Sequence, residues 1–148
     1  MTHKDAGGYA AKHASGTVVE EKLAAAIRDN SVQGKIACAQ AEMISAKLGV
    51  KLIEVGVAVD LLEVRIKNCQ LGLFGFPKEK FPGGKTVAPA KVVAPDIEAA
   101  IRARLVEEKL SCKSAWEIAA EKGMSKMAVS EACENLKIRI KPCQLGAF

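Results

Sequence analysis

The stretch IKNCQLGLFG, residues 66–75, is written a second time as IKPCQLGAF at residues 140–148. A shift of 74 positions superimposes Cys69 on Cys143 and aligns about fifty residues of each copy without a gap. Nearly half of the aligned positions are identical, whereas chance would give only a few matches. The chain is therefore predicted to be an internal duplication of one domain, and two copies are too few for a solenoid.

The duplication predicts four segments along the chain. Residues 1–16 are polar and rich in Gly and Ala, and we expect a flexible N-terminal segment there. The first repeat is expected at 17–74 and the second at 96–148. Residues 75–95 have no counterpart in the other copy, and their Pro and Gly content is typical of a linker.

The composition limits the class of protein. Apolar residues make up 49% of the 148 residues but aromatic residues only 4%, so the cores must be built from Ala, Val, Ile and Leu. There is no apolar run of about 18 residues, which predicts no membrane span. The first residues lack the apolar stretch of a secretion signal, so we expect a cytoplasmic protein. A net charge of +5 favours polyanionic partners only weakly.

Each copy reads as helix, strand, helix, turn, helix and strand. Thr17 and Asp96 are expected to cap the first helices. The second helices are expected to end at Gly49 and Gly123, because Gly tolerates the left-handed backbone of a helix C-terminus. Apolar residues at helical spacing then predict a third helix in each copy.

The middle of each copy carries the pattern of a helix-turn-helix. That motif needs a small residue where its helices touch, Gly at the turn, and buried apolar residues on its second helix. The matching positions are Ile44, Ser45, Gly49, Val50, Val55 and Ala58 in the first copy, and Ile118, Ala119, Gly123, Met124, Val129 and Ala132 in the second. Lys122 departs from the pattern, because an apolar residue is usual there.

With a helix before the motif and a strand, turn and strand after it, each copy resembles a winged helix-turn-helix domain. The resemblance is to prokaryotic regulators, including the N-terminal domains of LysR-type and molybdate-responsive regulators, and it covers about fifty residues per copy. It implies a mainly α fold with small β wings. It also implies a DNA-binding protein of transcription regulation, active as a homodimer.

The resemblance also implies which residues would touch DNA, because such domains lay their second helix in the major groove. The candidates in the second repeat are Ser125, Lys126, Met127 and Ser130, next to Glu131 and Glu134, with Lys51, Arg139 and Lys141 as further contacts. In the first repeat the same face is apolar. Leu52, Ile53 and Val57 are therefore expected in an interface, as is Trp116.

Two further readings of the sequence stay open. The chain could be a protein-interaction or assembly module that has kept the fold without DNA binding. It could also be a metal or redox sensor, because Cys38, Cys69, Cys112 and Cys143 recur in both copies, although no cofactor is otherwise indicated. Small buried thiols in a core would explain the same cysteines. Leu71, Phe74 and Gly72 could likewise serve packing and a tight turn.

An enzyme is not expected. The sequence contains no Gly-rich phosphate loop, no helix with paired metal ligands and no Ser-His-Asp arrangement.

Overall fold

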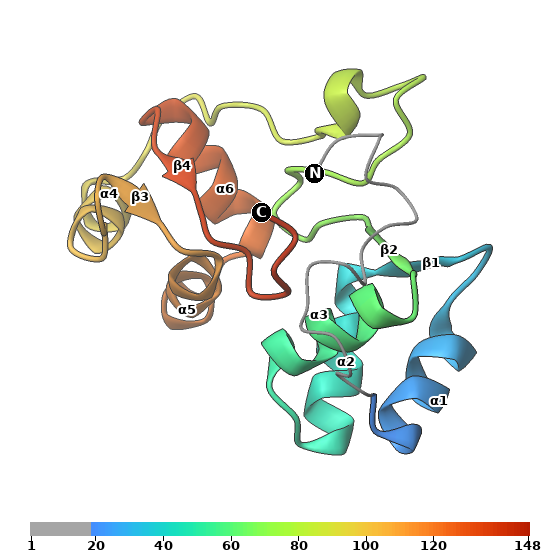
Figure 1. The fold of residues 1–148 in the computed structure, drawn as a ribbon. Coiled ribbons are helices and arrows are strands. Elements are labelled where there is room, and N and C mark those ends of the chain that lie inside the picture. Colours follow the sequence, from blue (N-terminus) through green and yellow to red (C-terminus); the bar gives the residue numbers. More distant parts are fainter. Residues whose placement is uncertain (1–18) are drawn as a thin grey trace. The chain divides into compact units, whose positions relative to one another are not determined.

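The computed structural model describes residues 19–148, so the N-terminal segment 1–16 and the expected cap Thr17 lie outside the described residues. By its contacts the chain divides into two units. The first contains the described residues up to Cys69 together with Leu145–Ala147, and the second contains Gln70–Gln144 together with Phe148. Both units are mainly helical with a few short strands, as the mainly α class predicts (Figure 1).

The two units repeat the same order of elements. The first has α1 (Glu21–Asn30), β1 (Lys35–Ala37), α2 (Cys38–Leu48), α3 (Leu52–Leu61) and β2 (Arg65–Lys67). The second has the 3₁₀-helix η3 (Pro82–Gly84), α4 (Pro95–Arg102), β3 (Lys109–Leu110), α5 (Cys112–Lys122), α6 (Lys126–Asn135) and β4 (Arg139–Ile140). Pro95 is the first residue of α4 and Ala94 its cap, so the expected cap at Asp96 is wrong by two residues.

The helix turn in each unit is made as the glycines predict. Gly49 and Gly123 end α2 and α5 with φ of 67° and 63°, in the left-handed region. Their N–H groups donate to the carbonyls of Ser45 and Ala119, which closes the last helical turn. Since L side chains are strained at such φ values, Gly sets the point where one helix stops and the next begins.

Each unit has one pair of short strands, and both pairs are parallel. β1 pairs with β2, with Lys35 opposite Arg65, and β3 pairs with β4, with Lys109 opposite Arg139. No return strand follows β2 or β4 within residues 19–148, so the strand, turn and strand expected after the motif is wrong there.

Local chemistry explains why no return strand forms. After β2, Asn68 turns the chain with a φ of 51°. After β4, Pro142 has no N–H to extend the ladder.

The same core is built twice. Ile27, Ile36, Ala41 and Val55 are fully buried in the first unit. Their equivalents 74 positions later, Ile101, Leu110, Ala115 and Val129, are also fully buried. Burying one Ile or Leu side chain contributes about 1.5–3 kcal/mol, so these positions carry much of the stability of each unit.

No helix within residues 19–148 has the length and hydropathy that a membrane span requires.

Candidate interaction surface on the second helices

The second helices α3 and α6 begin at equivalent positions but are capped differently. Ahead of α3, the backbone N–H of Lys51 donates to Glu54 Oε2 at 2.7 Å. Ahead of α6, the Ser125 hydroxyl accepts a hydrogen bond from the Ala128 N–H at 3.0 Å. Both hydrogen bonds satisfy a backbone N–H at the start of the helix, and the caps Lys51 and Ser125 are equivalent positions of the repeat.

The outer face of α6 is in contact with the first QLG segment, residues 70–72. Lys126 Nζ donates to Gln70 Oε1 at 3.1 Å and lies 3.9 Å from the centroid of the Trp116 ring. Gly72 packs so closely on α6 that a Cβ at this position would lie 2.6 Å from the sulfur of Met127. Its φ of 72° also favours glycine, so both the backbone conformation and the close contact disfavour a side chain at position 72.

Residues 85–90, within the segment expected to be a linker, also lie along the second unit's α6. The N–H groups of Thr86 and Val87 both donate to the Gly72 carbonyl, at 2.8 and 3.2 Å. Lys85 pairs with Glu134 at 2.5 Å. The Ala90 N–H donates to the Glu131 carbonyl at 2.9 Å, and Asn135 Nδ2 donates to the Ala90 carbonyl at 2.7 Å. This part of the chain therefore follows α6 as a strap.

In the first unit, α3 contacts the second QLG segment, residues 144–146. A Cβ added to Gly56 would lie 2.0 Å from the carbonyl oxygen of Leu145, which is closer than any real Cβ contact. A Cβ added to Gly146 would lie 3.4 Å from Cδ1 of Ile53. Leu145 itself is only 3% exposed. The missing side chain at Gly56 thus makes room for the backbone of another segment.

The predicted DNA contacts on α6 differ in their accessibility. Ser125 is exposed, but its hydroxyl is used as the helix cap. Lys126 and Met127 are half-buried and contact Gln70 and Gly72, respectively. Ser130 is fully buried, so its side chain is not accessible to a base edge in this structure.

The predicted DNA contacts outside α6 all have exposed side chains. They are Lys51, Arg139 and Lys141. Arg139 lies in β4, and Lys141 follows that strand directly.

The predicted interface residues lie on or beside the second helices. Leu52 and Val57 on α3 are half-buried, and Ile53 is 49% exposed next to Gly146. Trp116 on α5 lies under Lys126. The structure contains one chain, so a partner subunit for these residues remains a prediction.

The cysteines do not form a recognisable metal centre in the described part of the chain. Cys38, Cys69 and Cys112 are buried and Cys143 is half-buried, and none of the five cysteines, all within residues 19–148, is in a disulfide. No group of three or more His, Cys, Asp or Glu side chains within residues 19–148 is placed to hold a metal ion. Burial, and secondly the nearby charge of Glu134, raises the pKa of the Cys133 thiol to about 12.

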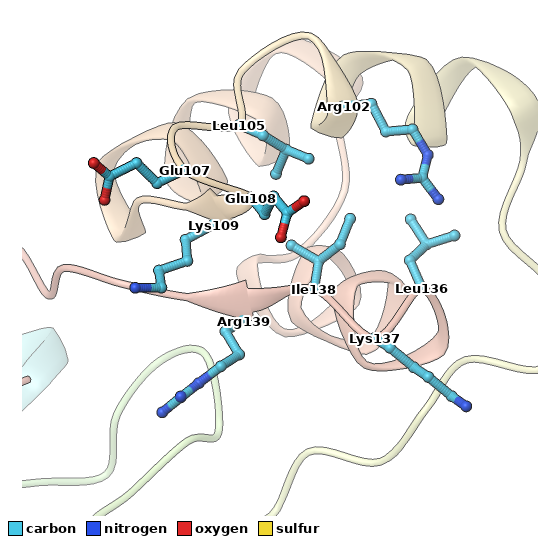
Figure 2. Close-up of a pocket in the computed structure, with 9 residues that line it drawn as sticks. All are labelled: Arg102, Leu105, Glu107, Glu108, Lys109, Leu136, Lys137, Ile138 and Arg139. Atoms are coloured by element: carbon cyan, nitrogen blue, oxygen red, sulfur yellow. The ribbon is translucent and has the colours of Figure 1, made fainter.

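Sequence reasoning missed an open pocket in the second unit between the end of α4, β3 and the start of β4 (Figure 2). Its volume is about 480 Å³. It is lined by Arg102, Leu105, Glu107, Glu108, Lys109, Leu136, Lys137, Ile138 and Arg139. Its lining includes four basic and two acidic side chains, and Arg102 is already paired with Glu98 at 2.7 Å. Figure 2 shows the charged ends of Lys109, Lys137 and Arg139 directed away from its apolar residues, so the pocket presents no single charge to a ligand.

No protein-family model matches the chain, and comparisons with curated proteins and with solved structures found no match. The function therefore has to be inferred from the contacts of α3 and α6.

Proposed function

We propose that this protein is an interaction module whose second helices, α3 and α6, bind Gln-Leu-Gly turns and do not read DNA. One observation carries the proposal. In both units the outer face of the second helix is in contact with a QLG segment, at Gly56 and Ile53 on α3 and at Lys126 and Met127 on α6. A helix that enters the major groove needs this face open.

The chemistry of the contact fits peptide binding. Small residues at the surface of a helix allow another backbone to approach closely, as Gly56 does for Leu145. The side chains of Leu71 and Leu145 are removed from water, which supplies the affinity. On α6 the amide oxygen of Gln70 also accepts a hydrogen bond from Lys126. Buried apolar anchors surrounded by a few polar contacts are the usual composition of a protein interface.

The charges on α6 support the same function. On the strap side of the helix, the Glu134 carboxylate pairs with Lys85 and the backbone carbonyl of Glu131 accepts a hydrogen bond from Ala90. Carboxylates on a face turned towards DNA would repel the phosphates, whereas beside the strap one of them gains a cationic partner. A surface pair of this kind contributes only about 0–1 kcal/mol, so the strap is attached mainly by its backbone hydrogen bonds and packing.

A second candidate is DNA binding through the second repeat in transcriptional control. The exposed side chains of Lys51, Arg139 and Lys141 favour it. Contact through α6 itself would require the first QLG segment and the strap to leave the helix, and Ser130 to become accessible. A metal or redox function of Cys38, Cys69, Cys112 and Cys143 also stays a prediction, which metal analysis of anaerobically purified protein would test.

A salt titration with random duplex DNA tests the proposed function. We expect no measurable binding even near 50 mM salt, because the proposed interaction face does not release counterions from phosphates. A log-log slope steeper than about −3 would imply that several phosphates are neutralised. If Lys126→Ala then reduced that slope by about 1, α6 would be a DNA-contacting helix and the proposal would be wrong.

A further inference from the structure

The two QLG segments are each placed on the second helix of the opposite half of the chain. Residues 70–72 follow β2 of the first repeat in sequence, yet they belong to the second unit and contact α6. Leu145 and Gly146 follow β4 of the second repeat, yet they belong to the first unit and contact α3. Each helix pair is therefore completed by a segment from the other repeat.

The same contact is made twice with equivalent residues. Gly146 lies against Ile53, and Gly72 lies against Met127. The two contacts are equivalent, because Gly72 aligns with Gly146 and Met127 aligns with Ile53 in the repeat. Two copies of a chain that exchange identical segments would produce this reciprocal pattern, in which i contacts j and j contacts i.

The α3 groove, defined by Ile53 and Gly56, receives the backbone of Leu145 and Gly146. Gly56 excludes any side chain of its own because the Leu145 carbonyl occupies the Cβ position, and Leu145 is almost completely buried. A segment with a charged residue at the leucine position would have to bury that charge without a partner. The groove therefore disfavours a segment with a charged residue at the position of Leu145.

We infer that the α3 groove accepts residues 145–147 of a second copy of this chain, so that two chains assemble by exchanging this segment. The inference rests on the proposed interaction function and names its partner. A second copy carries the identical segment, so exchange replaces every contact of Leu145 and Gly146 with the same contact made in trans. Exchange of an identical element is a route to dimers that introduces no new surface.

The chain's own segment competes with the second copy. Because the segment and the groove are parts of one chain, the effective concentration of the chain's own segment exceeds a micromolar concentration of second copies, so the unmodified chain is expected to keep its own segment bound. The exchange can be detected when a chain cannot bind its own segment but can still bind the segment of another chain.

Two complementary variants create that situation. Leu145→Asp leaves the α3 groove unchanged but prevents the segment from binding, because a carboxylate would replace the buried leucine. Gly56→Leu keeps the segment but fills the groove, because its side chain would occupy the place of the Leu145 carbonyl. We expect each variant alone to have the mass of one 15.7 kDa chain and an equimolar mixture at about 100 µM to form a species of about twice that mass.

The matched control is the double variant Gly56→Leu/Leu145→Asp, which has neither groove nor segment and should not associate with Leu145→Asp. A labelled peptide of residues 141–148 gives a second measurement. It should bind Leu145→Asp at least about tenfold more tightly than the unmodified chain, which still holds its own segment. The same peptide should dissociate the mixed dimer. Peptide binding to the double variant at equal strength would overturn the groove assignment.

If either single variant does not fold, Leu145→Ala and Gly56→Ala replace them in the same mixture. A mixture of folded variants that stays monomeric while the peptide binds Leu145→Asp would overturn the second copy as the partner. The proposed interaction function would then stand with another occupant. DNA binding through α6 would instead overturn the proposed function itself, so the two failures are distinguishable.

Discussion

Replacing Gly56 with alanine sets two physical effects of opposite sign against each other. Gly56 lies inside α3, and in a helix interior Gly→Ala normally stabilises by about 0.5–1 kcal/mol. In this protein the new methyl group would lie 2.0 Å from the Leu145 carbonyl oxygen. A backbone oxygen cannot move aside as the end of a side chain can, so we expect Leu145 and Gly146 to be displaced from α3.

The magnitude follows from what the displacement exposes. Leu145 is 3% exposed, and burial of a leucine side chain contributes about 1.5–3 kcal/mol. After subtraction of the gain in helix propensity, Gly56→Ala should lower the free energy of unfolding by about 0.5–2.5 kcal/mol. Urea denaturation measures this as a lower midpoint at an almost unchanged slope.

Two comparisons isolate the cause. In a Leu145→Ala background the segment has already lost its anchor, so Gly56→Ala should there become stabilising by about 0.5–1 kcal/mol. The matched position on α6 is Ser130, whose buried hydroxyl has no hydrogen-bond partner, so Ser130→Ala should be neutral or stabilising by up to about 1 kcal/mol. An increase in stability from Gly56→Ala in the unmodified chain would refute the close approach of Leu145 to α3.

Three further predictions concern the second unit and its cysteine. Gly72→Ala should destabilise by about 1–3 kcal/mol in thermal unfolding, because the strain at positive φ is joined by a contact that the ends of the Met127 and Thr86 side chains must move to relieve, whereas Gly34→Ala, with a φ of 75° and open space around it, should cost only about 1 kcal/mol. The Ala90 amide should be protected in hydrogen exchange, and Asn135→Ala should raise its exchange rate about tenfold; fast exchange in the unmodified chain would contradict the strap. Because burial raises the pKa of Cys133 from 9.0 to about 12, its contribution to stability should be present below pH 9 and lost as the pH rises from 9 towards 12, and Cys133→Ala should flatten this part of the pH profile.

The elements that depend on short stretches of sequence could be predicted. Apolar residues at helical spacing and a glycine with a left-handed backbone define α2 and α3 locally, and Gly49 and Gly123 have the expected conformation. The duplication also predicts that the two copies share one register, and Lys35 opposite Arg65 indeed recurs as Lys109 opposite Arg139. In these cases the residues that carry the signal are neighbours in the chain or repeat in register.

The destination of the QLG segments could not be predicted in the same way. Leu71 and Leu145 are recognisably core residues, and both are buried, but nothing in a three-residue segment indicates which helix it will contact. The winged fold predicts a second strand after β2 and β4. Instead, Asn68 and Pro142 follow these strands, and the chain continues to one of the second helices. Gly56 was a usable signal, because a glycine inside an otherwise apolar helix indicates a close backbone approach.

The contact between Phe74 and Phe148 has a consequence for how the sequence of this protein can evolve. These residues occupy the same position in the two copies, and their rings meet edge to face with centroids 5.8 Å apart. In an assembly of identical chains, any substitution alters both sides of such a contact at once. A chain that carries both copies can alter one side alone, as the pairs Gly56 and Ser130, Ile53 and Met127, and Asn68 and Pro142 illustrate. Duplication thus allows the two grooves to acquire different specificities while each still receives a Gln-Leu-Gly segment.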